Sequence, residues 1–250
     1  MKKFRFLGIC LLAMTACVNF SSCSDDDDDR QGSTPSINQG RRLKAIYTDG
    51  NYPYYYFANA QWDGNKIISF MDGEDLSDES NRMSITYSGE SAYINRYTIE
   101  LNDKGFATKA YFGGYEYLYS YNENGQMTHW ECQDPDYPNY NECCNIFYDG
   151  NGDITRIYPS YGDNKTFVYV NDSVTSPIEN KGGIMLLSDW NIMGDWEYYY
   201  WFGIYGKATK HLPVKVGDDT YNWTLDKKGY PTSCKVETDE YVWTYCFEWE

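Results

Sequence analysis

The chain has 250 residues, of which 42% are hydrophobic, and a formal net charge of −16. This length excludes a small disulfide-stapled scaffold and leaves room for one large domain or two small ones. The hydrophobic content is enough for a packed core, and the negative charge argues against nucleic acid as a partner, because an acidic surface repels phosphates.

Residues 1–22 have the pattern of a signal peptide. A basic start at residues 1–5 is followed by an apolar run at residues 6–18. That run is shorter than the roughly 20 residues that span a bilayer and is typical of a cleaved export signal. Two serines then precede Cys23, an arrangement that resembles a bacterial lipobox, in which the cysteine is acylated. We therefore predict lipidation at Cys23, with Cys17 as the competing match.

Residues 23–40 are predicted to form an acidic, flexible tether. Cys23 is followed by a serine and five aspartates, and then by a stretch rich in Gln, Gly, Ser and Pro, which is typical of a linker. Loss of residues 1–22 leaves 18 basic and 37 acidic residues, a net charge of −19. The acidic run resembles the export signal of Bacteroidota surface lipoproteins. It implies a protein anchored by its acyl chains in outer-membrane lipid and facing the extracellular side; the periplasmic face stays open as an alternative.

A turn pattern recurs four times in the remaining residues, 41–250. Each copy has an apolar residue, Asn or Asp, two further residues, Gly, two more residues and Thr. Asn or Asp opens a turn through its side chain, Gly supplies a positive φ, and Thr favours a strand, so each copy predicts a β-hairpin. The four copies are residues 101–108, 121–128, 148–155 and 225–232.

The segments beside these turns alternate with period two, which is the strand signal. The clearest case is residues 241–249, where every second residue is aromatic. We predict one all-β domain over residues 41–250: a single antiparallel meander of hairpin repeats that forms a strongly curved or closed barrel-like sheet. One short helix is expected at residues 184–193.

The four turn segments resemble degenerate YD repeats, and the copy at residues 148–155 is the closest. Together with the lipobox and the acidic run, the chain is similar to a family of Bacteroidota surface lipoproteins that is classed only as a domain of unknown function with a porin-like β fold. Residues 203–213 also resemble a late segment of that family. The resemblance implies a curved or closed sheet in the cell envelope and assigns no catalytic residue.

Composition predicts a soluble rather than membrane-spanning sheet. A spanning barrel needs an apolar outward band, whereas residues 41–250 contain 28 Leu, Ile and Val against 43 aromatic residues. A lipidated N-terminus would also be redundant on an integral barrel.

Five cysteines remain after processing, which leaves at least one thiol unpaired. Cys234 and Cys246 flank a predicted hairpin turn and are candidates for a cross-strand disulfide. Cys132 could pair with Cys143 or Cys144 across the polar loop between them. The spacing matches no metal site, and no cofactor is expected; small buried thiols explain the group equally well.

No catalytic residue is assigned. The two histidines, His129 and His211, are expected to be surface or packed residues, and the chain lacks the usual nucleophile, zinc and phosphate-loop motifs. Residues 149–153 resemble the start of a calcium loop, but the hairpin pattern explains them as well. Residues 172–174 resemble an acceptor for O-glycosylation.

Aromatic residues in loops are the main lead to function, because aromatic rings stack on sugars. The candidates lie where no strand pattern is obvious: Tyr137, Tyr140, Trp190, Trp196 and Tyr198. The first hypothesis is a non-enzymatic surface module that binds a glycan or another envelope component. The second is a structural or accessory partner of an outer-membrane complex, and the third is a glycoside hydrolase, because 37 acidic residues always offer some carboxylate pair.

Overall fold

The computed structural model describes residues 41–50, 53–64, 66–95, 97–134, 136, 141–193 and 203–250. The chain divides into two compact units, residues 1–30 and 31–250, and every described residue belongs to the second unit. The predicted signal peptide and tether therefore lie outside the described residues. Within the described part, no helix has the length and apolar character needed to cross a membrane.

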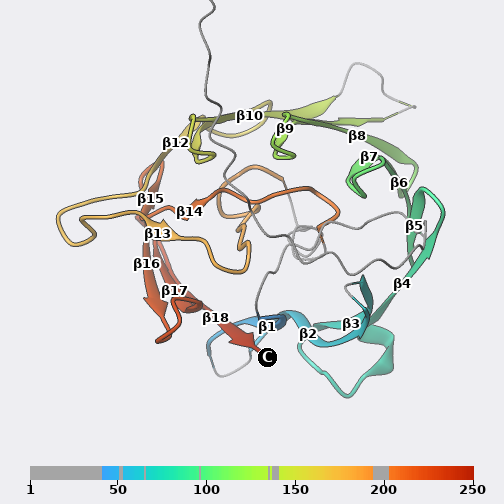
Figure 1. The fold of residues 1–250 in the computed structure, drawn as a ribbon, viewed down its shortest axis with the longest axis horizontal. Helices are drawn as coiled ribbons and strands as arrows, with labels where there is room; N and C mark the ends of the chain where they lie inside the picture. Colours follow the sequence, from blue (N-terminus) through green and yellow to red (C-terminus); the bar gives the residue numbers. More distant parts are fainter. Residues whose placement is uncertain are drawn as a thin grey trace, which may run out of the picture. The chain divides into compact units, whose positions relative to one another are not determined.

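Sixteen strands of the described residues form one closed antiparallel barrel (Figure 1). Neighbours along the chain pair in sequence, and the last strand pairs with the first, with Leu43 opposite Trp249. Two further strands, β13 and β14, pair with each other inside the ring (Figure 1). The strands are β1 (Leu43–Thr48), β2 (Tyr55–Asp63), β3 (Lys66–Gly73), β4 (Arg82–Ser88), β5 (Ser91–Ile94), β6 (Tyr97–Leu101), β7 (Ala107–Phe112), β8 (Tyr115–Tyr121), β9 (Met127–Gln133), β10 (Glu142–Tyr148), β11 (Ile154–Pro159), β12 (Lys165–Val168), β13 (Ile178–Glu179), β14 (His211–Leu212), β15 (Lys215–Val216), β16 (Asp219–Leu225), β17 (Pro231–Glu237) and β18 (Val242–Trp249), with a 3-10 turn at Glu79–Asn81 before β4.

The predicted hairpins form at all four copies of the turn pattern. In the copy between β8 and β9, the Asn122 side chain accepts a hydrogen bond from the Gln126 amide (2.9 Å), and Gly125 has a φ of +80°. Thr128 donates to the carbonyl of Ser120 across the hairpin (3.3 Å). The other three copies repeat these side-chain bonds at the equivalent positions.

These four hairpins lie at one end of the barrel, because alternate turns of an antiparallel meander share an end. They connect β6 to β7, β8 to β9, β10 to β11 and β16 to β17. We call this end the Gly-turn rim and the other end the opposite rim. β1 starts and β18 ends at the Gly-turn rim, where the Glu250 amide donates to the Arg42 carbonyl (2.9 Å).

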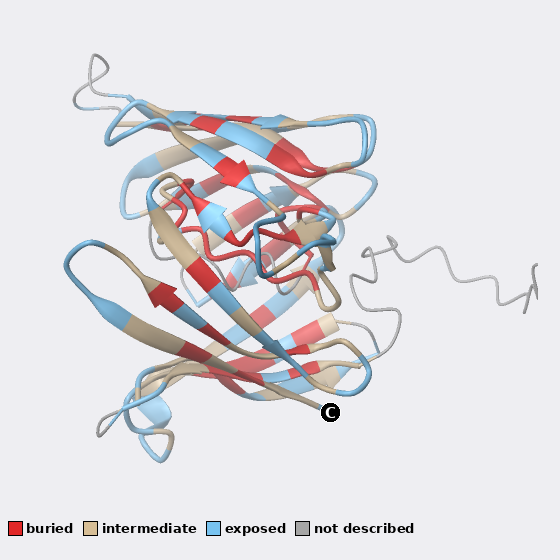
Figure 2. Ribbon diagram, turned by 90° about the vertical axis from the view of Figure 1, so that its left-hand side faces the viewer, coloured by how far each residue is buried: buried red, intermediate tan, exposed pale blue. Residues whose placement is uncertain are grey.

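Strand residues alternate between buried and exposed, as the banded colours of Figure 2 show. The buried side chains of the wall form one cluster with the chain between β12 and β15. We call residues 178–193 and 203–214 of that connection the plug. Each fully buried aliphatic or aromatic side chain contributes about 1.5–3 kcal/mol, so the plug is a main part of the core. Its buried residues in the first part are Ile184, Met185, Leu186, Leu187, Trp190, Ile192 and Met193.

The short helix expected at residues 184–193 is not formed. The Trp190 amide donates to the Leu186 carbonyl (2.9 Å), which makes a single turn, and Asn191 then takes a φ of +57° that ends it. The prediction was wrong because most side chains of this run pack into the common core with the barrel wall, and such tertiary contacts override a weak local preference for helix.

Candidate functional site

The plug is held against the Gly-turn rim by hydrogen bonds to backbone atoms of the rim. The Ile204 carbonyl accepts from the Ala107 amide beside the first turn (2.7 Å), and the Lys207 amide donates to the Gly125 carbonyl in the second (2.8 Å). The Lys210 amide donates to the Gly152 carbonyl in the third (3.1 Å). Lys181 Nζ donates to the Lys228 carbonyl at the fourth turn (2.9 Å). The repeated turn therefore anchors the plug as well as closing each hairpin.

The residue after each turn glycine faces the lumen, and it differs between copies. Gln126 Nε2 donates to the carbonyls of Gly152 (2.8 Å) and Ala208 (3.3 Å). Phe106 packs against Tyr121 with ring centroids 5.2 Å apart, and Tyr230 packs against Trp249 with centroids 5.1 Å apart. The remaining residue of this kind, Asp153 in the third copy, binds the plug through both carboxylate oxygens.

Asp153 is buried and binds the plug strand β14. One carboxylate oxygen accepts from the His211 amide (2.8 Å), and the other lies 2.7 Å from His211 Nδ1. Thr209 Oγ1 lies 3.4 Å from the carboxylate and 3.0 Å from the Tyr169 hydroxyl. Burial raises the pKa of the Tyr169 phenol above its usual value, so this hydroxyl stays protonated. The two outer residues of the calcium-like pattern are thus occupied: Asp149 caps its own turn, and Asp153 binds His211.

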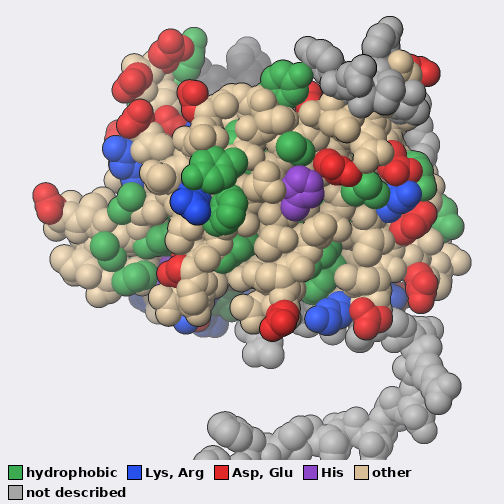
Figure 3. Space-filling view, turned by 90° about the horizontal axis from the view of Figure 1, so that it is seen from above, with side chains coloured by type: hydrophobic (Ala, Val, Ile, Leu, Met, Phe, Trp, Pro, Cys, Tyr) green, Lys and Arg blue, Asp and Glu red, His purple; other side chains and the backbone are tan. Residues whose placement is uncertain are grey.

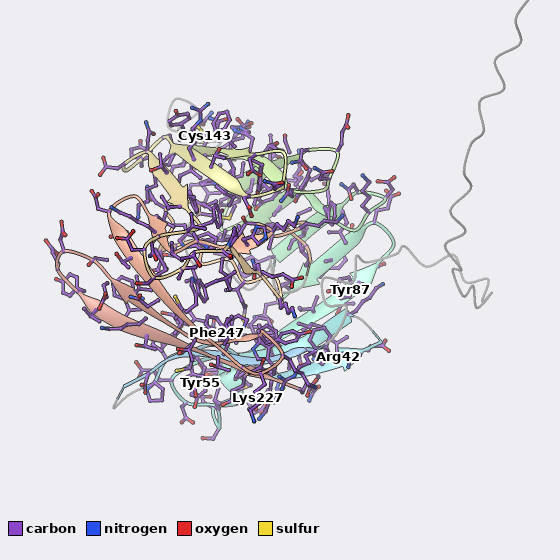
Figure 4. All side chains as sticks on the ribbon, turned by 60° about the vertical axis from the view of Figure 1, so that its left-hand side comes forward. Arg42, Tyr55, Tyr87, Cys143, Lys227 and Phe247 are labelled. Atoms are coloured by element: carbon purple, nitrogen blue, oxygen red, sulfur yellow. The ribbon has the colours of Figure 1, made fainter. Side chains whose placement is uncertain are left out.

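A pocket of about 170 Å³ opens at the opposite rim between the plug and the wall strands β9–β11. We call it the mouth pocket. Trp130 Nε1 donates to the Ile192 carbonyl (2.6 Å), and Asn191 Nδ2 donates to the Tyr161 carbonyl (3.4 Å). These two bonds hold the plug residues of the pocket against its wall residues. Cys143, labelled in Figure 4, lies at its edge. The lining residues are Trp130, Glu142, Cys143, Pro159, Ser160, Tyr161, Ser188, Asn191, Ile192 and Met193.

An aromatic row continues from the mouth pocket along the inner wall. The Tyr117 ring centroid lies 6.5 Å from that of Trp130 and 6.5 Å from that of Phe112, and Phe112 lies 4.2 Å from Tyr97. A slot of about 20 Å³ beside this row has room for about one water. The mouth pocket is therefore the part of this region that can hold a larger group, and its edge carries carboxylate, hydroxyl and amide side chains.

Of the five predicted stacking residues, Trp190 is the one that the structure describes, and the prediction was wrong for it. Trp190 is 0% exposed and packs edge-on against Phe167 and Tyr221, with centroids 5.6 and 6.4 Å away. It is a core residue of the plug and cannot present a face to a ligand. Tyr137, Tyr140, Trp196 and Tyr198 lie outside the described residues.

The predicted disulfide between Cys234 and Cys246 is also wrong, because both thiols are free. Cys234 lies opposite Tyr245, and Cys246 lies opposite Ser233. Since neighbouring positions on a strand face opposite sides of a sheet, the two thiols point away from each other. Burial raises the pKa of Cys234. The other three described cysteines are free as well, and burial raises the pKa of Cys144 to about 12.

The mouth pocket was missed because its residues come from four segments with no shared motif. A signal did exist for the plug anchors. The residue after each turn glycine varies between Phe, Gln, Asp and Tyr while the turn itself repeats, which indicates that this position makes different contacts in each copy. Among the described residues, no group of three or more His, Cys, Asp and Glu side chains is arranged to hold a metal ion.

Solved structures share the fold, among them two porin-like proteins. One is a porin-like protein from Bacteroides uniformis ATCC 8492, with 16% identity and a TM-score of 0.66 over 87% of this chain and 100% of that one. The other is a porin-like protein from Bacteroides vulgatus ATCC 8482, with 12% identity and a TM-score of 0.59 over 84% of this chain and 99% of that one. No family model and no curated protein matches the chain.

These neighbours confirm the porin-like part of the resemblance and correct the predicted fold class. The prediction of a soluble rather than membrane-spanning sheet is wrong, because it conflicts with the porin-like neighbours. The count of aliphatic residues was an unsuitable test. It covered residues 41–250 together and did not separate the outer face, which a bilayer would contact, from the inner wall and the plug.

Proposed function

We propose that the protein is held at the outer membrane by acylated Cys23 and that its barrel binds a glycan at the mouth pocket. The observation that carries the proposal is the filled lumen: the plug occupies the inside of the wall and shares one hydrophobic core with it. A barrel packed in this way is suited to presenting a binding surface at its rim rather than to conducting solutes. The porin-like neighbours support an outer-membrane location.

Glycan binding is supported by the chemistry of the mouth pocket. Tyr161 is 50% exposed at the pocket edge and offers a ring face for a sugar. Glu142, Ser160 and Asn191 supply hydrogen-bonding groups around it. Sugar-binding sites need this combination of an apolar face and several directed polar groups.

Tyr161→Ala is expected to weaken binding of the recognised glycan at least tenfold, about 1.4 kcal/mol, because the stacking face is lost. A glycan array with the full chain would identify the ligand, and calorimetry would give the affinities. Tyr241→Ala is the matched control, because Tyr241 is also an exposed tyrosine (68%) but lies in the β17–β18 turn, away from the pocket. Equal losses for the two variants would contradict the pocket assignment. If no glycan binds and the chain instead co-purifies stoichiometrically with an envelope protein, the accessory-partner hypothesis takes its place.

Acylation at Cys23 is tested separately from glycan binding. Cys23→Ala is expected to abolish incorporation of labelled palmitate, whereas Cys17→Ala, at the competing match, leaves it unchanged. Metabolic labelling followed by immunoprecipitation measures both, and protease treatment of intact cells tests the predicted extracellular face. Retained label in Cys23→Ala would show that acylation occurs elsewhere.

A further inference from the structure

An arginine on the outer wall is clamped between two exposed aromatic rings. Arg156 on β11 lies with its guanidinium carbon 4.7 Å from the ring centroid of Phe147 and 5.4 Å from that of Tyr158. The two rings are 5.4 Å apart at 72° and are 38% and 37% exposed. Figure 3 shows this side of the barrel, over β9–β11, with a basic side chain set among hydrophobic ones. We call these three residues the Arg156 clamp.

Arg156 forms no ion pair with any acidic side chain of the described residues. Other basic residues of the wall are paired: Lys44 with Glu248, Lys109 with Glu116 and Lys235 with Glu237. In a chain where acidic residues outnumber basic ones by 37 to 21, a guanidinium held by rings rather than by a carboxylate keeps its hydrogen-bond donors available.

Polar side chains lie beside the clamp on the neighbouring strands, including one carboxylate, that of Glu131 on β9, which is 3.8 Å from His129 Nε2. Across the sheet, Arg156 lies opposite Thr166 on β12, and Tyr158 lies opposite Asn145 on β10. Asn145 Oδ1 is 3.0 Å from His129 Nδ1 on β9. The clamp therefore has hydroxyl, amide and imidazole groups within one or two strands, about 5–10 Å away at the usual strand spacing.

This arrangement suits an oxyanion attached to a sugar ring. The guanidinium presents parallel donors that match the two oxygens of a carboxylate or phosphate. The two rings hold the guanidinium in place, which lowers the entropy lost on binding, and their exposed parts offer apolar contact to a sugar. A free inorganic ion would use the guanidinium alone.

We propose that the Arg156 clamp is a binding site for an acidic saccharide, one that carries a carboxylate or a phosphate. The site lies on the outer wall two residues from the start of β11 at the Gly-turn rim, whereas the mouth pocket lies at the opposite rim. This inference therefore goes beyond the proposed function and does not depend on it.

The test is calorimetry on the full chain with four probes: an oligogalacturonate, its uncharged methyl ester, glucose 6-phosphate and inorganic phosphate. We expect one or both acidic probes to bind and the methyl ester to bind at least tenfold more weakly. The acidic probe that binds identifies the oxyanion. Equal binding of the ester overturns the role of the charge, and inorganic phosphate binding as tightly as the acidic sugars overturns the role of the ring.

Variants assign the binding to the clamp. Arg156→Gln is expected to reduce affinity for the acidic probe at least tenfold, and Arg156→Lys to reduce it less, because the charge remains but the fork is lost. Lys235→Gln, a wall residue already paired with Glu237, is the control and should leave affinity unchanged. Matching near-ultraviolet circular dichroism shows that the variants are folded. Unchanged affinity in Arg156→Gln overturns the proposal, whereas loss of glycan binding in Tyr161→Ala alone concerns only the mouth pocket.

Discussion

Gly206→Ala is expected to destabilise the barrel by about 3 kcal/mol. Gly206 has a φ of +84°, where an L-residue is strained by about 1 kcal/mol. An added Cβ would also come too close to the carbonyl oxygen of Gly125 in the second turn. Since that oxygen belongs to the backbone and accepts the Lys207 amide, it cannot move without breaking the plug anchor, and overpacking of this kind costs about 1–3 kcal/mol.

Urea unfolding followed by tryptophan fluorescence measures this loss, with Gly89→Ala as the matched control. Gly89 also has a positive φ (+58°), but an added Cβ there has no atom within 4 Å. The control should therefore show only the backbone strain, about 1 kcal/mol. Equal losses in the two variants would mean that the plug does not press on the Gly-turn rim.

Asp153→Ala is expected to cost about 3 kcal/mol, because it leaves the His211 amide and ring nitrogen without their acceptor in a buried site. Asp153→Asn keeps one oxygen for the His211 amide, so the expected loss is about half as large. Thermal and urea unfolding of both variants measure the difference.

Two comparisons separate this contact from a general effect of losing an acidic residue. Asp103→Ala removes an exposed carboxylate from the first turn and should change stability by less than about 0.5 kcal/mol. In a His211→Gln background, Asp153→Ala should cost less than in the native chain, because the two residues are coupled. Strict additivity of the two substitutions would contradict a direct contact between them.

Local sequence patterns predicted the hairpins because the information that specifies them is local. The side chain of Asn122, the positive φ of Gly125 and the hydroxyl of Thr128 act within seven residues of each other. The alternation at residues 241–249 likewise predicted β18, in which Tyr245 and Phe247 are buried. Neither pattern depends on the rest of the fold.

The plug and the mouth pocket could not be predicted, because both depend on contacts between distant segments. The plug strands have only two residues each, too few for a periodic signal. Trp190 was misjudged because a loop without strand pattern is normally exposed, whereas this one is enclosed by the wall. The disulfide prediction failed for a smaller reason. Glu237 pairs with Val242, so the turn has four residues, whereas a three-residue turn would place Cys234 opposite Cys246. One extra residue turns a side chain to the other face of the sheet.

The pairing of β1 with β18 also bears on how the molecule is made. Leu43 and Trp249 are neighbours in the barrel but are more than 200 residues apart in the chain, so the seam cannot close until the ribosome has released almost the entire polypeptide. Until then, both margins of the growing sheet offer unpaired backbone groups to other chains. Such distant pairings slow folding, and we therefore expect a nascent chain that needs a holding chaperone during synthesis and transport.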